Sequence, residues 1–392
     1  MPPPPPPAGP AGRASPVLPI VLISAVFVFG VDAMIGQILR NGYVDFASSL
    51  LADDGRPHFL PGTNWLILRH FVGVPPVDKF LATANVFWAN VADGSRLELS
   101  LFAFFFGTQL VGFFTVFIIE AQRVARRSSL LFNPLVWGFL MQTLGYGIAA
   151  PVFFALHLAV TSKSRLVDTV RLRDPISLHS IVPAFALGYF ALCLFLAYPY
   201  SQGSVRQWTN AVWQTFPLHV VAWQAIITAV IKRTSLGQDA FTSKIQLDRR
   251  ALTAAYGFAW NVAVSGQVGT SIAFILSWTK LIPAHAARAF AFRPVFLPGL
   301  PHTSTPMASP AAATHNYFQY DLYVGSAVAI IWAVYLLSEV SPVLSTAAER
   351  KKLARGIAWS VWASGPAGAL VALMRHRDEL VLAAELKAER SQ

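Results

Sequence analysis

Long apolar stretches separated by short polar runs make up most of this chain. Eight of them approach the roughly 20 apolar residues that a helix needs to cross a bilayer: 17–38, 97–119, 134–160, 180–199, 212–231, 252–277, 320–340 and 356–374. A further stretch, 76–92, is shorter and holds charged residues, so we expect an interfacial or re-entrant helix there. The pattern predicts an all-α fold, a polytopic transmembrane helical bundle of about eight spans.

The two ends of the chain differ from this pattern. Residues 1–16, MPPPPPPAGPAGRASP, form a Pro-rich segment that we expect to be a disordered tail. Residues 17–380 then form a single transmembrane helical domain, and 381–392 form a polar C-terminal tail.

Composition supports a membrane protein. Charged residues make up only 12% of the chain, against about 25% in soluble domains. The net charge of +11 comes from Lys and Arg in the connections, which favours contact with an anionic lipid surface over nucleic acid. A single cysteine excludes an intrachain disulfide.

Polar side chains within the apolar stretches are the candidates for function. At about 100° per residue on a helix, Gln142, Tyr146, Phe153 and His157 share one face of the predicted span 134–160. We therefore expect one polar and aromatic stripe turned into the bundle.

A second stripe follows the predicted span 320–340. Asp321, Trp332 and Glu339 share its face, but the two acids lie about 27 Å apart along the axis at 1.5 Å per residue. Alternation of eight spans predicts that Glu120 and Asp321 lie toward one membrane surface and His157 toward the other. Each of these residues can also have a purely structural role. An acid at a helix end can extend its carboxylate to the membrane interface, and a buried His often only packs against its neighbours.

The sequence lacks the motifs of several common kinds of catalytic site. The only adjacent aspartates, in ADDGRP, have no third Asp at helical spacing, so a Mg²⁺–diphosphate site is not indicated. Histidines spaced for Zn²⁺ and Gly-rich phosphate loops are also missing. The activity that these exclusions leave is proton transfer in an apolar, aromatic cavity. The alternative is transport.

Five segments together resemble a known family. These are LRHFVGVPPVDKFLATANVFWANV, FIIEAQRVARRS, NPLVWGFLMQTLGYGIAAPVFFALHLAVTS, FQYDLYVGSAVAIIWAVYLL and SGPAGALVALMRHRDELV. Over residues 66–380 the chain resembles fungal integral-membrane cyclases and epoxide hydrolases of polyketide and meroterpenoid biosynthesis, of the ascochlorin/ascofuranone, aurovertin and citreoviridin type. The resemblance implies acid-catalysed opening of an epoxide, followed by capture by water, an internal hydroxyl or an alkene.

The resemblance also implies which residues belong to the site. Its motifs contribute Asp78, Glu120, Arg123, Gln142, His157 and Asp321. The stretch after Glu120 lacks the Gly-Asn associated with the family, so the role of Arg123 is not fixed by it.

These observations give one set of expectations. The catalytic candidates are Asp321, Glu120, Asp78 and His157, and the substrate-binding candidates are Gln142, Tyr146, Trp332 and Arg123. Protonated carboxyl groups open epoxides and aromatic faces stabilise cationic centres. We expect a membrane-bound secondary-metabolite enzyme that opens an epoxide to cyclise or hydrate a polyketide or terpenoid intermediate, without metal or organic cofactor.

The expected location is the endoplasmic reticulum membrane. The expected partners are a hydrophobic small-molecule substrate, the lipid bilayer and neighbouring pathway enzymes, with no nucleic acid. The alternative function is a small-molecule membrane transporter or channel. A non-catalytic scaffold, in which the buried carboxylates are dispensable, is a third possibility.

Overall fold

The computed structural model describes residues 15–126, 130–162, 164–234 and 243–391. Within these ranges the regular elements are helices, and the β-type pairing consists of two isolated bridges, Phe59–Leu66 and Arg123–Leu172. The prediction of an all-α fold is confirmed. Nearly all of the expected Pro-rich tail lies outside the described residues.

Within the described residues, five helices are long and apolar enough to cross a membrane. They are Val17–Arg40 (α1 Val17–Val31, the π-turn η1 Asp32–Gly36 and α2 Gln37–Arg40), α5 Leu97–Ala121, α13 Lys244–Ser277, α16 Pro310–Ser338 and α17 Ala347–Arg390. A sixth is obtained if α11 Gly203–Gln214 and α12 Phe216–Arg233, bent by 59°, count as one span. The count of about eight is not confirmed.

The difference arises where predicted spans are broken. The stretch 134–160 is two short helices, α6 Pro134–Leu144 and α7 Tyr146–Thr161. The stretch 180–199 contains one shorter apolar helix, Ile181–Ala197, made of α9 Ile181–Phe185, the π-turn η5 Ala186–Phe190 and α10 Ala191–Ala197, and the short α8 Ile176–His179 precedes it. The stretch 76–92 contains α4 Pro75–Phe87, too short to span.

Helices α6 and α7 form a hairpin, and the expectation of one straight helix there is wrong. Asn133 caps α6, accepting a hydrogen bond from the Leu135 N–H at 2.9 Å. Gly145 ends the helix with φ +90°, a conformation that only glycine adopts easily. Past this turn the chain reverses, because the rings of Trp137 and Phe153, eight residues to either side, lie 5.1 Å apart.

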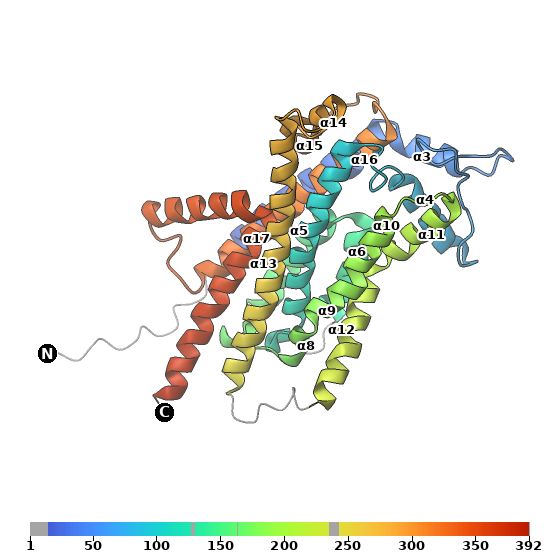
Figure 1. Ribbon diagram of the computed structural model, residues 1–392. Coiled ribbons are helices and arrows are strands. Elements are labelled where there is room, and N and C mark those ends of the chain that lie inside the picture. Colours follow the sequence, from blue (N-terminus) through green and yellow to red (C-terminus); the bar gives the residue numbers. More distant parts are fainter. Residues whose placement is uncertain (1–14, 127–129, 163, 235–242, 392) are drawn as a thin grey trace.

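The α6–α7 hairpin packs inside the bundle. Helix α7 packs against both α1 and α16, and α5 packs against α13 and α17 (Figure 1). The stacked rings of Phe113 on α5 and Tyr146 on α7 lie 4.1 Å apart, while Trp332 on α16 stacks on Phe154 of α7 at 4.5 Å. Helices α5, α7 and α16 therefore surround a common interior.

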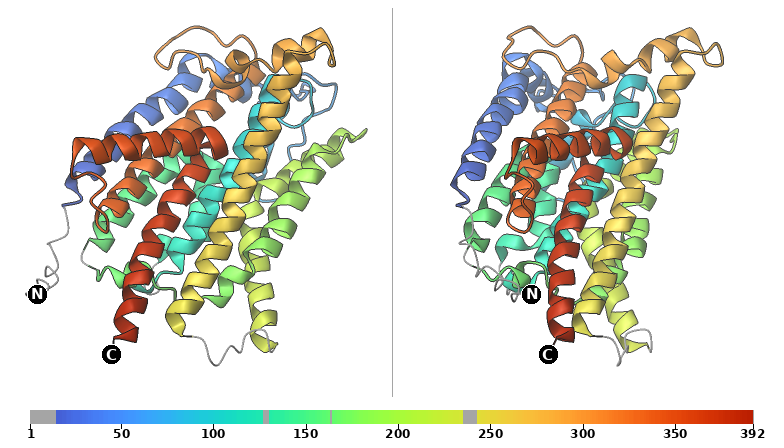
Figure 2. Two further views of the ribbon diagram at one scale, coloured as in Figure 1. Left: turned by 60° about the vertical axis from the view of Figure 1, so that its left-hand side comes forward. Right: turned by 90° about the vertical axis from the view of Figure 1, so that its left-hand side faces the viewer.

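Helix α17 changes direction at Gly365, where φ is +72°. Its first half runs across the bundle and its second half descends to the C-terminus (Figure 2). The buried Gln109 of α5 bridges the break, since its Oε1 accepts the Ala367 N–H at 3.0 Å and its Nε2 donates to the Ala263 carbonyl at 3.2 Å. A buried amide thus satisfies the backbone that the kink frees.

The remaining elements are short. They are α3 Tyr43–Leu51, α14 Ala284–Ala289, α15 Phe292–Phe296, η2 Val124–Arg126, η3 Leu130–Phe132 and η4 Val167–Thr169. Helix α15 lies over the end of α5 and is tied to α16 by Tyr323, whose hydroxyl donates to the Phe296 carbonyl at 2.6 Å.

Candidate functional site

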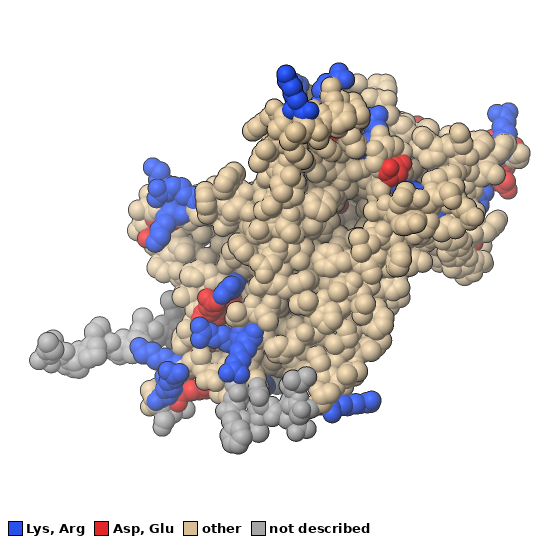
Figure 3. Space-filling view, viewed as in Figure 1, with Lys and Arg blue, Asp and Glu red and all other residues tan. Residues whose placement is uncertain are grey.

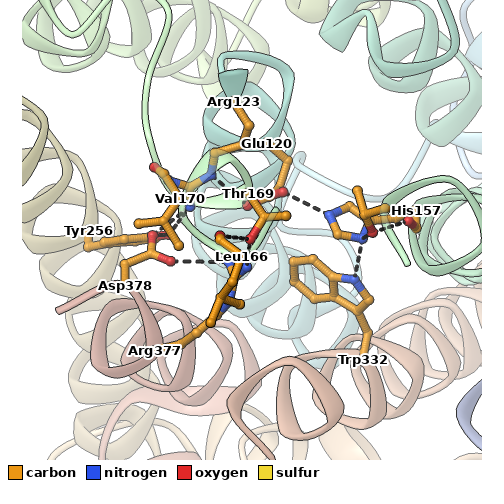
Figure 4. A network of polar contacts seen from close by, with 11 residues as sticks. Glu120, Arg123, His157, Leu166, Thr169, Val170, Tyr256, Trp332, Arg377 and Asp378 are labelled. Carbon is orange, nitrogen blue, oxygen red and sulfur yellow. Dashed lines mark hydrogen bonds and ion pairs between the residues drawn. The ribbon is translucent and has the colours of Figure 1, made fainter. Parts of the chain in front are cut away.

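One group of buried polar side chains lies where α5 ends (Figure 4). The guanidinium of Arg123 donates to Glu120 Oε1 at 3.0 Å, to Asp378 Oδ2 at 2.5 Å and to the Val170 carbonyl at 2.6 Å. The hydroxyl of Tyr256 also binds Asp378, at 2.8 Å. Because neither ion of the Arg123–Glu120 pair is exposed to solvent, each depends on the other for charge compensation.

His157 extends this group toward α16. The indole N–H of Trp332 can only donate, and it lies 3.0 Å from His157 Nδ1. His157 Nδ1 is therefore the acceptor, and Nε2 carries the proton that it donates to Glu120 Oε2 at 2.8 Å. Both oxygens of Glu120 thus receive a hydrogen bond in the described structure.

We call these seven residues the ion network, with members from α5 to α17: Glu120, Arg123, His157, Tyr256, Trp332, Arg377 and Asp378. Arg377 joins it by donating to Asp378 Oδ1 at 3.2 Å, and it also donates to Thr169 Oγ1 at 2.6 Å. The ion network connects α5, α7, α13, α16 and α17. Every carboxylate in it faces a cation or a neutral donor, which is the arrangement expected of a structural anchor.

A separate cavity of about 1140 Å³ lies nearer the other end of α5. Its wall is mostly apolar and aromatic, with Phe87, Trp88, Trp213, Tyr317 and Phe318 among the lining residues. The rings of Trp88 and Trp213 lie 4.5 Å apart and those of Trp88 and Phe318 5.0 Å apart. The cavity is large enough for a drug-sized apolar molecule.

Part of the cavity wall reaches the outer surface of the bundle. Phe104 is 49% exposed, Leu194 is 74% exposed, and Ser265 of α13 is also exposed. Figure 3 shows this face hollowed between α13 and α10, with charged side chains gathered mainly near its two ends. The opening therefore lies in an apolar part of the surface.

Asp321 contributes the carboxyl group of the cavity. Its Oδ1 accepts the Gly147 N–H, at the tip of the α6–α7 hairpin, at 2.5 Å. Within the described part of the chain, no cation pairs with it. Tyr146 lines the same cavity, and among the residues that the structure describes its buried hydroxyl has no hydrogen-bond partner. The uncompensated acid and Tyr146 therefore line one cavity beside the hairpin tip.

Asp78 lies outside both groups. At the start of α4, its carboxylate accepts the backbone N–H groups of Phe71, Val72 and Gly73 at 2.8 to 3.2 Å. These hydrogen bonds, led by the one from Val72, hold the pKa of Asp78 below its usual value. Its geometry is that of a carboxylate that orders a turn.

Apart from Asp78, the predicted site residues therefore divide into two groups. Gln142, Tyr146 and Asp321 line the cavity, whereas Glu120, Arg123, His157 and Trp332 belong to the ion network. The expectation from alternating spans, that Glu120 and Asp321 share a surface away from His157, is wrong. Glu120 contacts His157 and through it Trp332, eleven residues beyond Asp321 and so about 16 Å along α16.

Sequence reasoning missed Tyr256, Arg377 and Asp378. Arg377 and Asp378 occur in the charged run RHRDEL, which resembles an exposed helix end. Only the burial of both side chains, each 2% exposed or less, distinguishes them from their neighbours.

Comparisons with known proteins show the family to which the chain is related. The family model of the CtvD domain matches residues 18–382. The terpene cyclase ctvD of Aspergillus terreus is 27% identical over 88% of this chain and 95% of its own length. The terpene cyclase ascI of Acremonium egyptiacum is 25% identical over 92% of this chain and 91% of its own. No solved structure matches.

Proposed function

This chain belongs to the CtvD domain family, and from that premise we propose that it is a membrane-bound terpene cyclase of secondary metabolism. The cavity beside the hairpin tip is its active site. The observation that carries the assignment is Asp321, a buried carboxyl group without a cationic partner in the described residues, in the wall of an aromatic cavity.

The proposed reaction is acid-catalysed opening of an epoxide. Asp321 gives a proton to the epoxide oxygen, the C–O bond breaks, and positive charge develops on the carbon. An alkene or a hydroxyl of the same substrate then bonds to that carbon. The cation formed by this capture loses a proton, which restores the acid, so that the overall reaction is an isomerisation.

The lining of the cavity suits this chemistry. Aromatic faces attract cationic centres, and Trp is the most effective of them. Trp88 and Trp213 both line the wall. A mostly apolar cavity also admits little water, which favours internal capture over hydration.

Asp321 is the better acid than Glu120 or Asp78 on geometric grounds. A general acid needs an oxygen that can reach the substrate. Both oxygens of Glu120 accept hydrogen bonds in the ion network, and Asp78 accepts three from the backbone. In Asp321, the only hydrogen bond found among the described residues is at Oδ1.

The packing beyond Asp321 favours an enzyme over a transporter. The stacked rings of Phe113 and Tyr146 lie 4.1 Å apart, and those of Phe117 and Phe153 4.3 Å apart. These contacts fill the interior between the cavity and the ion network. A transport pathway needs an open route at this level.

The test is turnover by microsomes that contain the protein, with a panel of epoxidised prenyl and polyene substrates. We expect Asp321→Asn to lose activity by a factor of about 10² to 10⁴, the usual contribution of a general acid. The matched control is Asp53→Asn, at an exposed loop position outside the cavity. Full activity of Asp321→Asn would overturn the assignment of the acid.

We further propose that the endoplasmic reticulum membrane is the site of action and that the substrate arrives through the apolar opening beside Phe104. Co-localisation of a fluorescent fusion with an endoplasmic reticulum marker tests the location. A fusion found in another membrane would contradict it.

A further inference from the structure

Four side-chain amides from three helices form one continuous chain at the cavity wall. Gln142 of α6 donates from Nε2 to Gln214 Oε1 at 2.5 Å, and Gln214 donates to Asn210 Oδ1 at 3.1 Å. Asn210 donates to Asn85 Oδ1 at 3.1 Å, and Asn85 donates to the Leu81 carbonyl at 2.9 Å. We call this the amide relay.

The far end of the amide relay fixes its direction. A backbone carbonyl only accepts hydrogen bonds, so the group of Asn85 that faces Leu81 must be its NH₂. The oxygen of Asn85 then faces Asn210, which has to donate, and the same reasoning passes through Gln214 to Gln142. The orientation of each amide, normally ambiguous, is thus determined.

This direction decides what Gln142 presents at the cavity. One of the two N–H bonds of its Nε2 goes to Gln214 Oε1, and among the described residues no group donates to its Oε1. Both Gln142 and Gln214 line the cavity, whereas Asn210 and Asn85 are buried behind them at 4% and 3% exposure. The carbonyl oxygen of Gln142 is thus free to accept a hydrogen bond at the cavity end, next to the second N–H of the same amide.

We propose that Gln142 Oε1 binds a hydrogen-bond donor of the substrate, a hydroxyl or N–H group, and that the amide relay selects such substrates over equally apolar ones that lack the donor. This rests on the proposed function in taking the cavity as the substrate site. Gln142 lies three residues before Gly145, so the donor is held near the hairpin tip that contacts Asp321. Asn85 is a positioning residue, acting through Asn210 and Gln214.

The test measures binding without turnover. Tritium-labelled farnesol and farnesyl methyl ether are matched isoprenoid probes of 15-carbon chain length, and only the alcohol can donate. Equilibrium binding to the purified protein should show farnesol bound about tenfold more tightly, the effect of one well-formed hydrogen bond. In Gln142→Leu, we expect the two affinities to become equal while that for the ether is retained.

Two further variants test whether the amide relay acts by positioning Gln142 rather than by contacting the probe. Asn85→Leu does not touch the cavity but removes the anchor of the amide relay, so the preference for farnesol should fall toward parity with the affinity for the ether unchanged. Gln267→Leu, the same type of change on α13 outside the cavity, should keep the full preference. Loss of all binding in Asn85→Leu would show a merely structural role and would contradict its assignment as a positioning residue.

The outcomes distinguish this inference from the proposed function. Equal affinity of the two probes for the unaltered protein, or a preference that survives Gln142→Leu, would overturn the role of Gln142 and leave Asp321 unaffected. Failure of both probes to bind would overturn the use of this cavity for isoprenoids, and the proposed function with it.

Discussion

Glu120 and Asp321 are both buried acids on long helices, but their surroundings differ. Glu120 faces Arg123 and His157, whereas in the described structure Asp321 faces one backbone N–H and an apolar cavity. A buried charge with a full set of partners costs much free energy to disturb and has little freedom to react. The difference in partners separates a structural acid from a candidate catalyst.

We expect Arg123→Met to destabilise the protein by about 3–5 kcal/mol, since it leaves Glu120 and Asp378 without their shared cation. Thermal unfolding of the detergent-purified protein measures the loss. The matched control is Arg375→Met, which removes an exposed pair with Glu379 and should cost no more than about 1 kcal/mol. Equal melting temperatures of the two variants would contradict the structural role of the ion network.

At the scale of elements, the α6–α7 hairpin positions the site. It carries Gln142 on one arm and Tyr146 on the other, and its tip donates to Asp321. The close approach requires glycine, because a Cβ at Gly145 would lie 2.7 Å from Asp321 Oδ1. The turn also requires φ +90°.

Gly145→Ala should therefore abolish turnover and lower stability, since it forces the hairpin tip away from Asp321. Activity in microsomes and thermal unfolding measure the two effects. Gly257→Ala is the control, because a Cβ there meets open space within α13 and helix propensity favours Ala over Gly by about 1 kcal/mol. Wild-type activity of Gly145→Ala would contradict the placement of the active site at the tip.

At the scale of the whole molecule, the hairpin changes the topology. A single span over 134–160 would carry the chain across the membrane, whereas the hairpin returns it to the side from which it entered. The rings of Phe132, before α6, and His157, near the end of α7, lie 6.2 Å apart. The segment that follows the hairpin then begins on the side opposite to that expected from an unbroken span.

Cysteine labelling tests this topology. After Cys193→Ser removes the native thiol, we expect Asn133→Cys and Ser162→Cys to react with a membrane-impermeant maleimide from the same side of intact microsomes. Arg173→Cys, in the connection that follows, serves as a third position and should label from that side too. Labelling of positions 133 and 162 from opposite sides would show that 134–161 spans the membrane.

The sequence by itself determined the class of fold and three of the cavity residues. Apolar length predicted the helices α5, α13 and α16, because the hydrophobic effect acts on each stretch separately. It matched the start of α5, whereas α13 and α16 begin eight and ten residues before the predicted starts. Gln142, Tyr146 and Asp321 stood out because polar groups are costly in an apolar stretch. The resemblance to a family, now shown by the match over residues 18–382, also came from short local motifs.

Only the tertiary structure decided which polar residues meet. Gly145 reverses the chain in a stretch whose hydrophobicity is continuous, so no window of sequence distinguishes a hairpin from a span. The pairing of Arg123 with Asp378 joins positions 255 residues apart, and the amide relay joins α4, α6 and α11. Contacts of this kind depend on packing between helices, and that packing separates the ion network from the cavity acid.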